Sequence, residues 1–137
     1  MERFTDSQTY YVVFDQALGI RKWWHILLHP KFRHVFLMRD NSEGSLVINS
    51  MAHVIAIKQY PNSITNLVQQ ELAQFPTAIL QYTVHYGSHY KENYIELLTC
   101  VSVVKRILGI RSHLITPKSL YHELLKAGAI AIKPYVV

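Results

Sequence analysis

The chain has few cysteines, glycines and prolines. Its 137 residues include one cysteine, five glycines and five prolines. A single cysteine excludes an internal disulfide and any zinc site built from several cysteines, and it is compatible with a reducing compartment. The glycines are isolated, so the sequence has no glycine-rich loop of the kind that cradles phosphate, and it contains no internal repeat or low-complexity segment.

Long apolar runs are also missing. Half of the residues are apolar and 17% are charged, a balance typical of a folded chain rather than a disordered one. Charged residues interrupt every apolar run before it reaches membrane-spanning length. The first ten residues contain Glu2, Arg3 and Asp6 and no apolar run, so we predict no secretory signal. We expect one soluble domain over residues 1–137, with no membrane span.

Acidic residues are fewer than basic ones. Fourteen Lys and Arg against nine Asp and Glu give a formal net charge of +5, which favours an anionic partner such as nucleic acid or a cell-wall polymer. The basic residues are scattered, however, and no nucleic-acid-binding motif accompanies them. A solvated basic face explains them better than specific nucleic-acid binding does.

Hydrophobic periodicity predicts an α+β protein, a small antiparallel sheet packed against two or three helices. The expected strands are residues 10–14, 32–39, 45–51, 54–58, 77–86 and an edge strand within 130–137. The expected helices are residues 64–73 with Ser63 as cap, 99–109, and one that begins at Thr116 and Pro117 and ends at Gly128. Between the first two strands, residues 23–29 include Trp23 and Trp24 and predict a short helix or an aromatic-walled loop.

The strands at residues 32–39 and 45–51 predict a hairpin whose register matters for function. If a four-residue loop, residues 41–44, joins Asp40 opposite Ser45, then Phe36 faces Asn49, and His34 becomes a diagonal neighbour of Asn49 on the same sheet face. A slip of one residue would turn Asn49 to the other face. His53 begins the next extended segment and is a second candidate for a position near His34.

Cys100 opens a predicted helix with Thr99 as N-cap and Gly109 as its end. The unpaired N–H groups in the first turn of a helix favour the nucleophilic thiolate form of a cysteine. The alternative is an inert core thiol, because Cys100 also continues the apolar face of this helix. That face comprises Cys100, Val103, Val104, Ile107 and Leu108, with Ser102, Lys105 and Arg106 opposite.

Three residues together supply the roles that a cysteine hydrolase needs. Cys100 would be the nucleophile, His34 the general base and acid, and Asn49 the group that orients the imidazole ring. The hairpin register argues only for the proximity of His34 and Asn49, so the approach of Cys100 depends on the fold. A metal site is less well supported, because His25 and His29 lack the adjacent Glu of a zinc-protease motif. We predict no cofactor and no metal.

The segments Phe32-Arg-His-Val-Phe-Leu, Val47-Ile-Asn-Ser and Thr99-Cys-Val-Ser-Val-Val-Lys resemble the circularly permuted papain-like superfamily. This group includes permuted NlpC-type amidases and the lecithin:retinol acyltransferase family, in which histidine precedes cysteine. The segment from Cys100 through Thr116-Pro-x-x-Leu-Tyr is also similar to small proteins encoded by bacteriophages and prophages. The resemblance covers roughly residues 33–125.

The resemblance implies a single permuted papain-like domain acting on amide, peptide or acyl bonds. Matched by position, it makes Cys100 the nucleophile, His34 the base and Asn49 the orienting group, with His53 as the alternative to Asn49. The implied partners are a peptide, cell-wall or acyl substrate, and the implied location is the cytoplasm or a virion. The competing hypothesis is a phage virion or assembly component that binds other phage structural proteins without catalysis.

Overall fold

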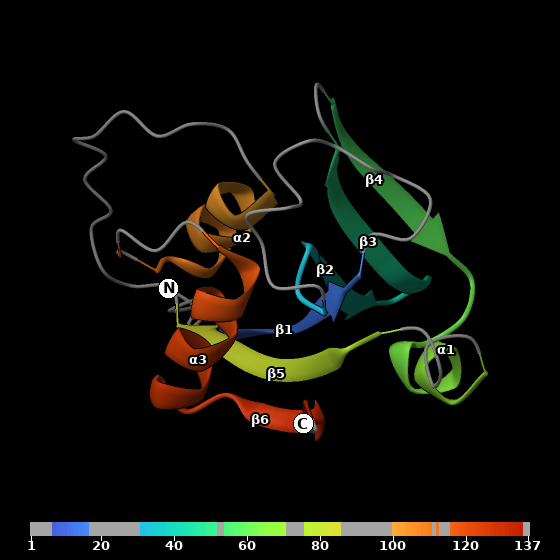
Figure 1. The fold of residues 1–137 in the computed structure, drawn as a ribbon. Helices are drawn as coiled ribbons and strands as arrows, with labels where there is room; N and C mark the ends of the chain where they lie inside the picture. The colour runs from blue at the N-terminus through green and yellow to red at the C-terminus, as the bar shows by residue number, and fades with distance from the viewer. Residues whose placement is uncertain are drawn as a thin grey trace, which may run out of the picture.

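The computed structural model describes residues 7–16, 31–51, 54–70, 76–85, 100–110, 112 and 116–135. These residues form an α+β fold with one antiparallel sheet and three helices (Figure 1). The strands are β1 (Ser7–Asp15), β2 (His34–Asn41), β3 (Gly44–Met51), β4 (Val54–Tyr60), β5 (Ala78–His85) and β6 (Ile130–Lys133). The helices are α1 (Ile64–Gln70), α2 (Cys100–Leu108) and α3 (Pro117–Lys126).

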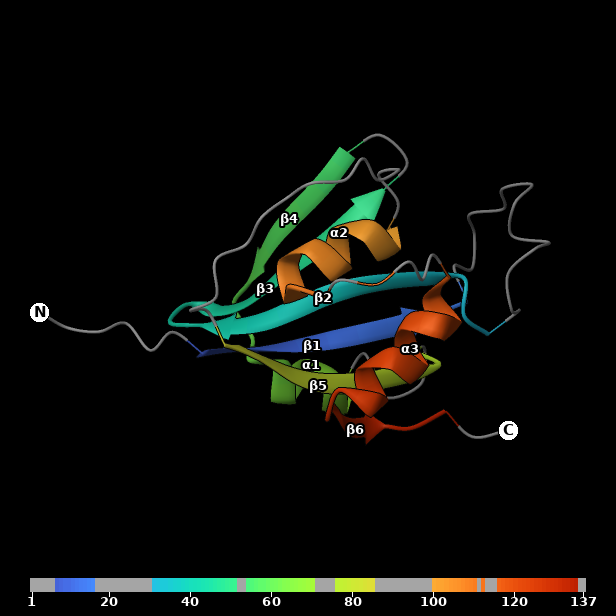
Figure 2. The ribbon, with the colours of Figure 1, turned by 90° about the vertical axis from the view of Figure 1, so that its left-hand side faces the viewer.

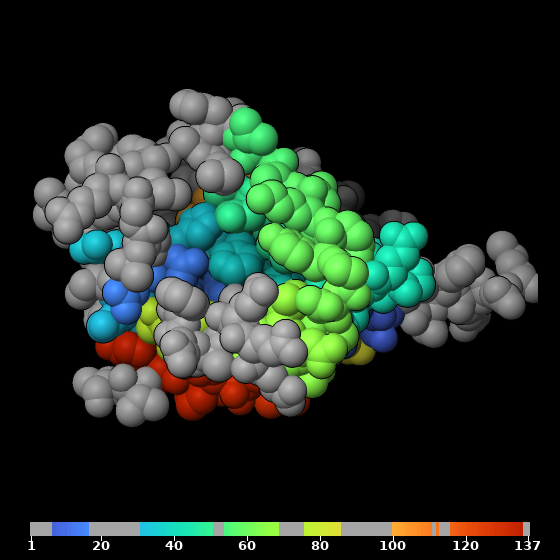
Figure 3. All heavy atoms as spheres, turned by 90° about the vertical axis from the view of Figure 1, so that its right-hand side faces the viewer, coloured from blue at the N-terminus to red at the C-terminus, as the bar shows by residue number. Residues whose placement is uncertain are grey.

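The six strands follow the order β4-β3-β2-β1-β5-β6, and every neighbouring pair is antiparallel. β1 is therefore an inner strand, and its apolar residues are buried on both faces. β4 and β6 are the two edges of the sheet. The edge position of β6 confirms the edge strand expected within residues 130–137. Figure 3 shows β4 on the molecular surface, where Val54 and Ile57 are each 62% exposed.

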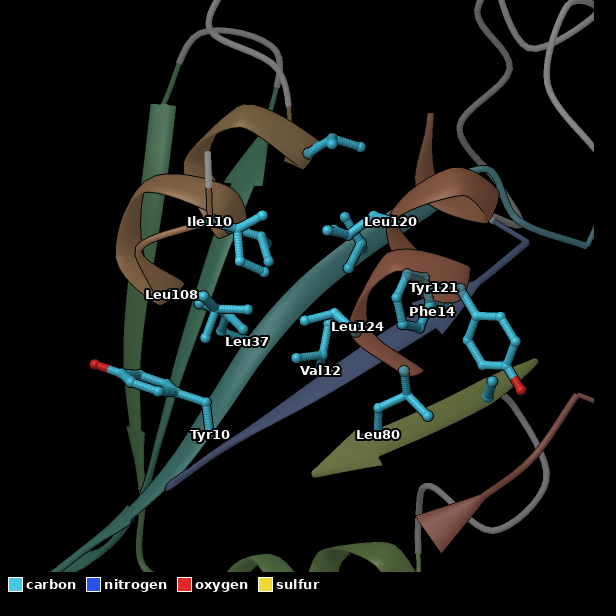
Figure 4. Close-up of a cluster of buried hydrophobic side chains, with 14 of the residues drawn as sticks. Tyr10, Val12, Phe14, Leu37, Leu80, Leu108, Ile110, Leu120, Tyr121 and Leu124 are labelled. Atoms are coloured by element: carbon cyan, nitrogen blue, oxygen red, sulfur yellow. The ribbon is translucent and has the colours of Figure 1, made fainter. Parts of the chain in front are cut away.

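Two hydrophobic cores cover the two faces of the sheet. α2 and α3 pack on one face and α1 on the other, an arrangement that Figure 2 shows from the side of α2 and α3. The larger core lies on the α2/α3 face and contains residues from three inner strands and both helices (Figure 4), among them Val12, Phe14, Leu37, Leu80, Leu108, Leu120 and Leu124. The smaller core, on the α1 face, contains Val13, Met38, Ile64, Leu67 and Ile79.

The predicted hairpin register is confirmed, because Asp40 pairs with Ser45. The loop is shorter than the four residues expected: Asn41 also pairs with Gly44, so only residues 42 and 43 lie outside the ladder. Gly44 has φ +133°, and a Cβ there would overlap the backbone of Tyr60 and Pro61. A side chain at this position is thus excluded by both conformation and space.

The helix caps agree with the sequence. Ser63 Oγ accepts a hydrogen bond from Asn66 N at 3.4 Å at the start of α1. Thr116 Oγ1 accepts one from Ser119 N at 3.2 Å at the start of α3, directly before Pro117. These side-chain oxygens satisfy N–H groups that the helices themselves leave unpaired.

One expectation for α2 was wrong. Ser102 and Lys105 were placed opposite the apolar face, yet they are only 4% and 2% exposed, whereas Arg106 is exposed as predicted. Lys105 is buried because its Nζ donates a 2.6 Å hydrogen bond to the backbone oxygen of Ser112, beyond the end of the helix. A buried polar group is tolerated where it has such a partner. The predictions for Trp23, Trp24 and Thr99 lie outside the described residues.

Candidate active site

β2 and β3 bring the first two predicted site residues together. His34 is the first residue of β2, and Asn49 lies near the end of β3, where the hairpin register makes them diagonal neighbours. His34 Nε2 lies 2.7 Å from Asn49 Oδ1. The two residues are separated by 15 positions in the chain, and both side chains are half-buried. The proximity expected from the register is therefore present.

This hydrogen bond selects one tautomer of neutral His34. An amide oxygen can only accept, so Nε2 must carry the proton and donate it to Asn49 Oδ1. Nδ1 is then the unprotonated nitrogen and can accept a proton from another group. A general base in this orientation needs its proton donor on the Nδ1 side of the ring.

Cys100 is the third member of the cluster. It is the first residue of α2, it is half-buried, and it lies close enough to His34 to raise the pKa of the imidazole. Since Nε2 is engaged by Asn49, we assign the thiol to Nδ1. His34 therefore interacts with both Cys100 and Asn49.

A separation of β2 from β3 makes room for the start of α2. Pairing between the two strands runs from Asn41–Gly44 to Leu37–Ile48 and does not extend to His34 or Asn49. Beyond that point β2 continues to pair with β1, and β3 with β4. In Figure 2, β3 and β4 rise away from β2, and α2, which contacts both β2 and β3, lies across them. Cys100 and His34 meet at this end of the sheet.

Alternation along the strands explains why this separation matters. Val35, Leu37 and Ile48 point to the α2/α3 face. His34 and Asn49 alternate with them and belong to the opposite face. Where β2 and β3 pair, their hydrogen-bonded ladder separates α2, which lies on the α2/α3 face, from side chains on the opposite face. Past Leu37–Ile48, the ladder between β2 and β3 has ended.

The surroundings of His34 favour its protonated form. Burial lowers the pKa of His34, but this effect is outweighed by the hydrogen bond and charge of Cys100, the hydrogen bond of Asn49 and the charge of Asp15, so its pKa is raised above the ordinary value. The same contacts suit a group that takes a proton from a thiol and later returns it.

The site includes one residue that the sequence analysis missed. Asp15 directly follows the strand expected over residues 10–14, yet it belongs to β1 and pairs directly with His34 across β1 and β2. The pairing of β1 with β2 joins segments on either side of residues 17–30, and no local pattern predicts its register. A carboxylate that ends a strand near a candidate base is the signal that could have drawn attention to it.

The remaining histidines concern the alternative to Asn49 and the metal site considered in the sequence. His53, the alternative to Asn49, and His25, His29 and His89 lie outside the described residues. His85 is exposed at the end of β5. Among the described residues, no group of three or more His, Cys, Asp or Glu side chains could hold a metal ion.

Comparison with protein-family models, curated proteins and solved structures found no match to this chain. Within the described part of the chain, no helix combines the length and apolar character needed to cross a membrane.

Proposed function

We propose that this protein is a thiol hydrolase or acyltransferase of the permuted papain-like type, with Cys100 as nucleophile, His34 as general base and acid, and Asn49 as the orienting group. The observation that carries the proposal is the position of His34. Its Nε2 is held by Asn49 Oδ1 at 2.7 Å, and Cys100 at the start of α2 lies close enough to raise the pKa of the ring. A nucleophile, a base and a third group that fixes the base are the three parts of a catalytic triad.

The reaction begins when the Cys100 thiol gives its proton to His34 Nδ1 and the sulfur attacks the carbonyl carbon of an amide, peptide or other acyl bond. The carbonyl oxygen of the tetrahedral intermediate gains negative charge, which the backbone N–H at the start of α2 is suited to stabilise. His34 then protonates the leaving group as the bond to it breaks, and an acyl thioester on Cys100 remains.

In the second half of the reaction, water or another acceptor attacks the thioester. His34 removes the acceptor's proton, and the departing sulfur takes it back, which restores the thiol. Water yields a hydrolase, whereas an amine or alcohol yields an acyltransferase. Asn49 holds Nε2 throughout, so that Nδ1 faces the sulfur in both halves.

Alkylation by iodoacetamide tests the pair directly, because Cys100 is the only thiol in the chain. Intact-mass spectrometry then reports reaction at a single residue. We expect the folded protein to react faster at about pH 6 than free cysteine does, because free cysteine carries little thiolate there. The variant His34→Ala should lose this reactivity. His85→Ala, which removes an exposed histidine from β5, is the matched control and should react like the parent protein.

An unreactive thiol, or one that His34→Ala leaves unchanged, would contradict the proposed chemistry. The chain would then be better described as a binding or assembly module, and its partners would be the next question. A reactive pair justifies a screen of peptides, cell-wall fragments and acyl donors. Loss of turnover in Cys100→Ser would assign the activity to the thiol.

A further inference from the structure

We propose that Asp15 is a positioning residue for His34: its carboxylate, on the neighbouring strand β1, supplies the negative charge that Asn49 lacks and stabilises the imidazolium formed when Cys100 gives up its proton. This role rests on the proposed function. It concerns the charge around His34 and not the bond that is cleaved. Asp15 would act only through His34 and need not touch substrate.

The sheet register places Asp15 beside His34. The two residues are direct partners at the end of the β1–β2 ladder, the last pair after Phe14 and Val35. Side chains of directly opposed residues in antiparallel strands lie on the same face, with Cβ atoms about 4.5–5.5 Å apart. The Asp15 backbone oxygen accepts a 2.9 Å hydrogen bond from Arg33 N, the residue before His34. The position of Asp15 relative to His34 is therefore determined by backbone hydrogen bonding.

A carboxylate supplies what an amide cannot. Asn49 Oδ1 accepts a hydrogen bond from His34 and selects the tautomer, but a neutral amide stabilises an imidazolium less than a carboxylate does. Asp15 is half-buried, so solvent screens its charge less than it would a fully exposed group. The charge of Asp15 acts in the direction that raises the pKa of His34.

Few charged or titratable groups act on His34 from the described elements packed around it. β1 contributes Asp15, α2 contributes Cys100, and β3 contributes the neutral Asn49. On β2 itself, the nearest ring is that of Phe36, whose centroid lies 6.2 Å from that of His34, and Arg33 precedes His34 in the chain. Asp15 is thus the carboxylate among the groups that raise the pKa of His34.

The decisive measurement is an NMR titration of the His34 ring protons in the full chain, assigned with His34→Ala. The proteins to compare are the parent, Asp15→Asn, Asp15→Glu and Glu43→Gln. Glu43 is exposed in the turn at the opposite end of the β2–β3 hairpin, so its variant controls for the loss of one negative charge. Repeating the series with Cys100→Ser separates the effect of Asp15 from that of the thiol.

We expect the titration midpoint of His34 to move to lower pH in Asp15→Asn, to return toward the parent value in Asp15→Glu, and to stay unchanged in Glu43→Gln. Alkylation of Cys100 at about pH 6 should also slow by roughly two- to fivefold in Asp15→Asn, the range of a single partly screened charge pair. The ring signals show whether each variant is folded, and Asp15→Glu keeps the charge if Asp15→Asn does not fold.

An unchanged midpoint in folded Asp15→Asn, or an equal shift in Glu43→Gln, would overturn the role of Asp15. This outcome differs from a failure of the proposed function. An unreactive Cys100 in the parent protein would refute the hydrolase chemistry, whereas the His34 titration reports the influence of Asp15 without any reaction at sulfur.

Discussion

Replacing Asn49 with Ala should destabilise the protein by an amount that depends on pH. The change removes the acceptor of the 2.7 Å hydrogen bond from His34 Nε2 and leaves this half-buried donor without that partner. When His34 is neutral, the bond joins two uncharged groups. When His34 is protonated, the same bond has a charged donor and is stronger.

The magnitude follows from these two states. A neutral hydrogen bond contributes about 0.5–1.5 kcal/mol to the free energy of unfolding, and one to a charged group about 1.5–3 kcal/mol. The folded-state pKa of His34 is raised, so its stabilising effect is fully present below its ordinary pKa of about 6.5 and is lost as the pH rises through the raised value. We therefore expect Asn49→Ala to cost about 2 kcal/mol near pH 5 but only about 1 kcal/mol near pH 9.

Urea unfolding at these two pH values measures the difference. Both proteins should carry Cys100→Ser, so that ionisation of the thiol does not contribute. Asn41→Ala is the matched control in the same hairpin, because the Asn41 amide is hydrogen-bonded to Gln59, which does not titrate. Its cost should be the same at both pH values. An equal cost of Asn49→Ala at about pH 5 and about pH 9 would refute the assignment of a protonated His34 bound to Asn49.

Two further predictions concern the scaffold and can be checked by the same urea unfolding. Leu124→Ala removes a side chain with no exposed surface from the larger core and should lower the free energy of unfolding by about 2–5 kcal/mol. Leu125→Ala, at the neighbouring exposed position, should lower it by about 0.5 kcal/mol or less. Similar losses in the two variants would contradict the packing of α3. Gly44→Ala and Gly128→Ala should each add roughly 1–3 kcal/mol of backbone strain. Only the new Cβ at position 44 would also clash with the backbone of Tyr60 and Pro61, so Gly44→Ala should be the more destabilising of the two. Equal costs for the two glycines would argue against the tight hairpin turn.

Patterns confined to a few residues predicted much of the fold. Alternation identified β2 and β5, and Ser63, Thr116 and Pro117 marked helix starts, because strand periodicity and capping depend on neighbouring residues alone. The pairing of Asp40 with Ser45 was also accessible, since a short turn dictates the register of a hairpin. That register, in turn, predicted the proximity of His34 and Asn49.

Contacts between distant segments were decided by the tertiary structure. The approach of Cys100 to His34 depends on how α2 packs against β2 and β3, where the pairing of these strands has ended past Leu37–Ile48. The pairing of Asp15 with His34 depends on a strand register across 18 intervening residues, and the burial of Lys105 on a partner beyond its own helix. The sequence by itself determined which residue types were available for thiol chemistry and which hairpin held two of them. Helix packing and long-range strand pairing decided which groups surround the His34 ring. These contacts join segments that are distant in the sequence, and no local sequence pattern predicts them.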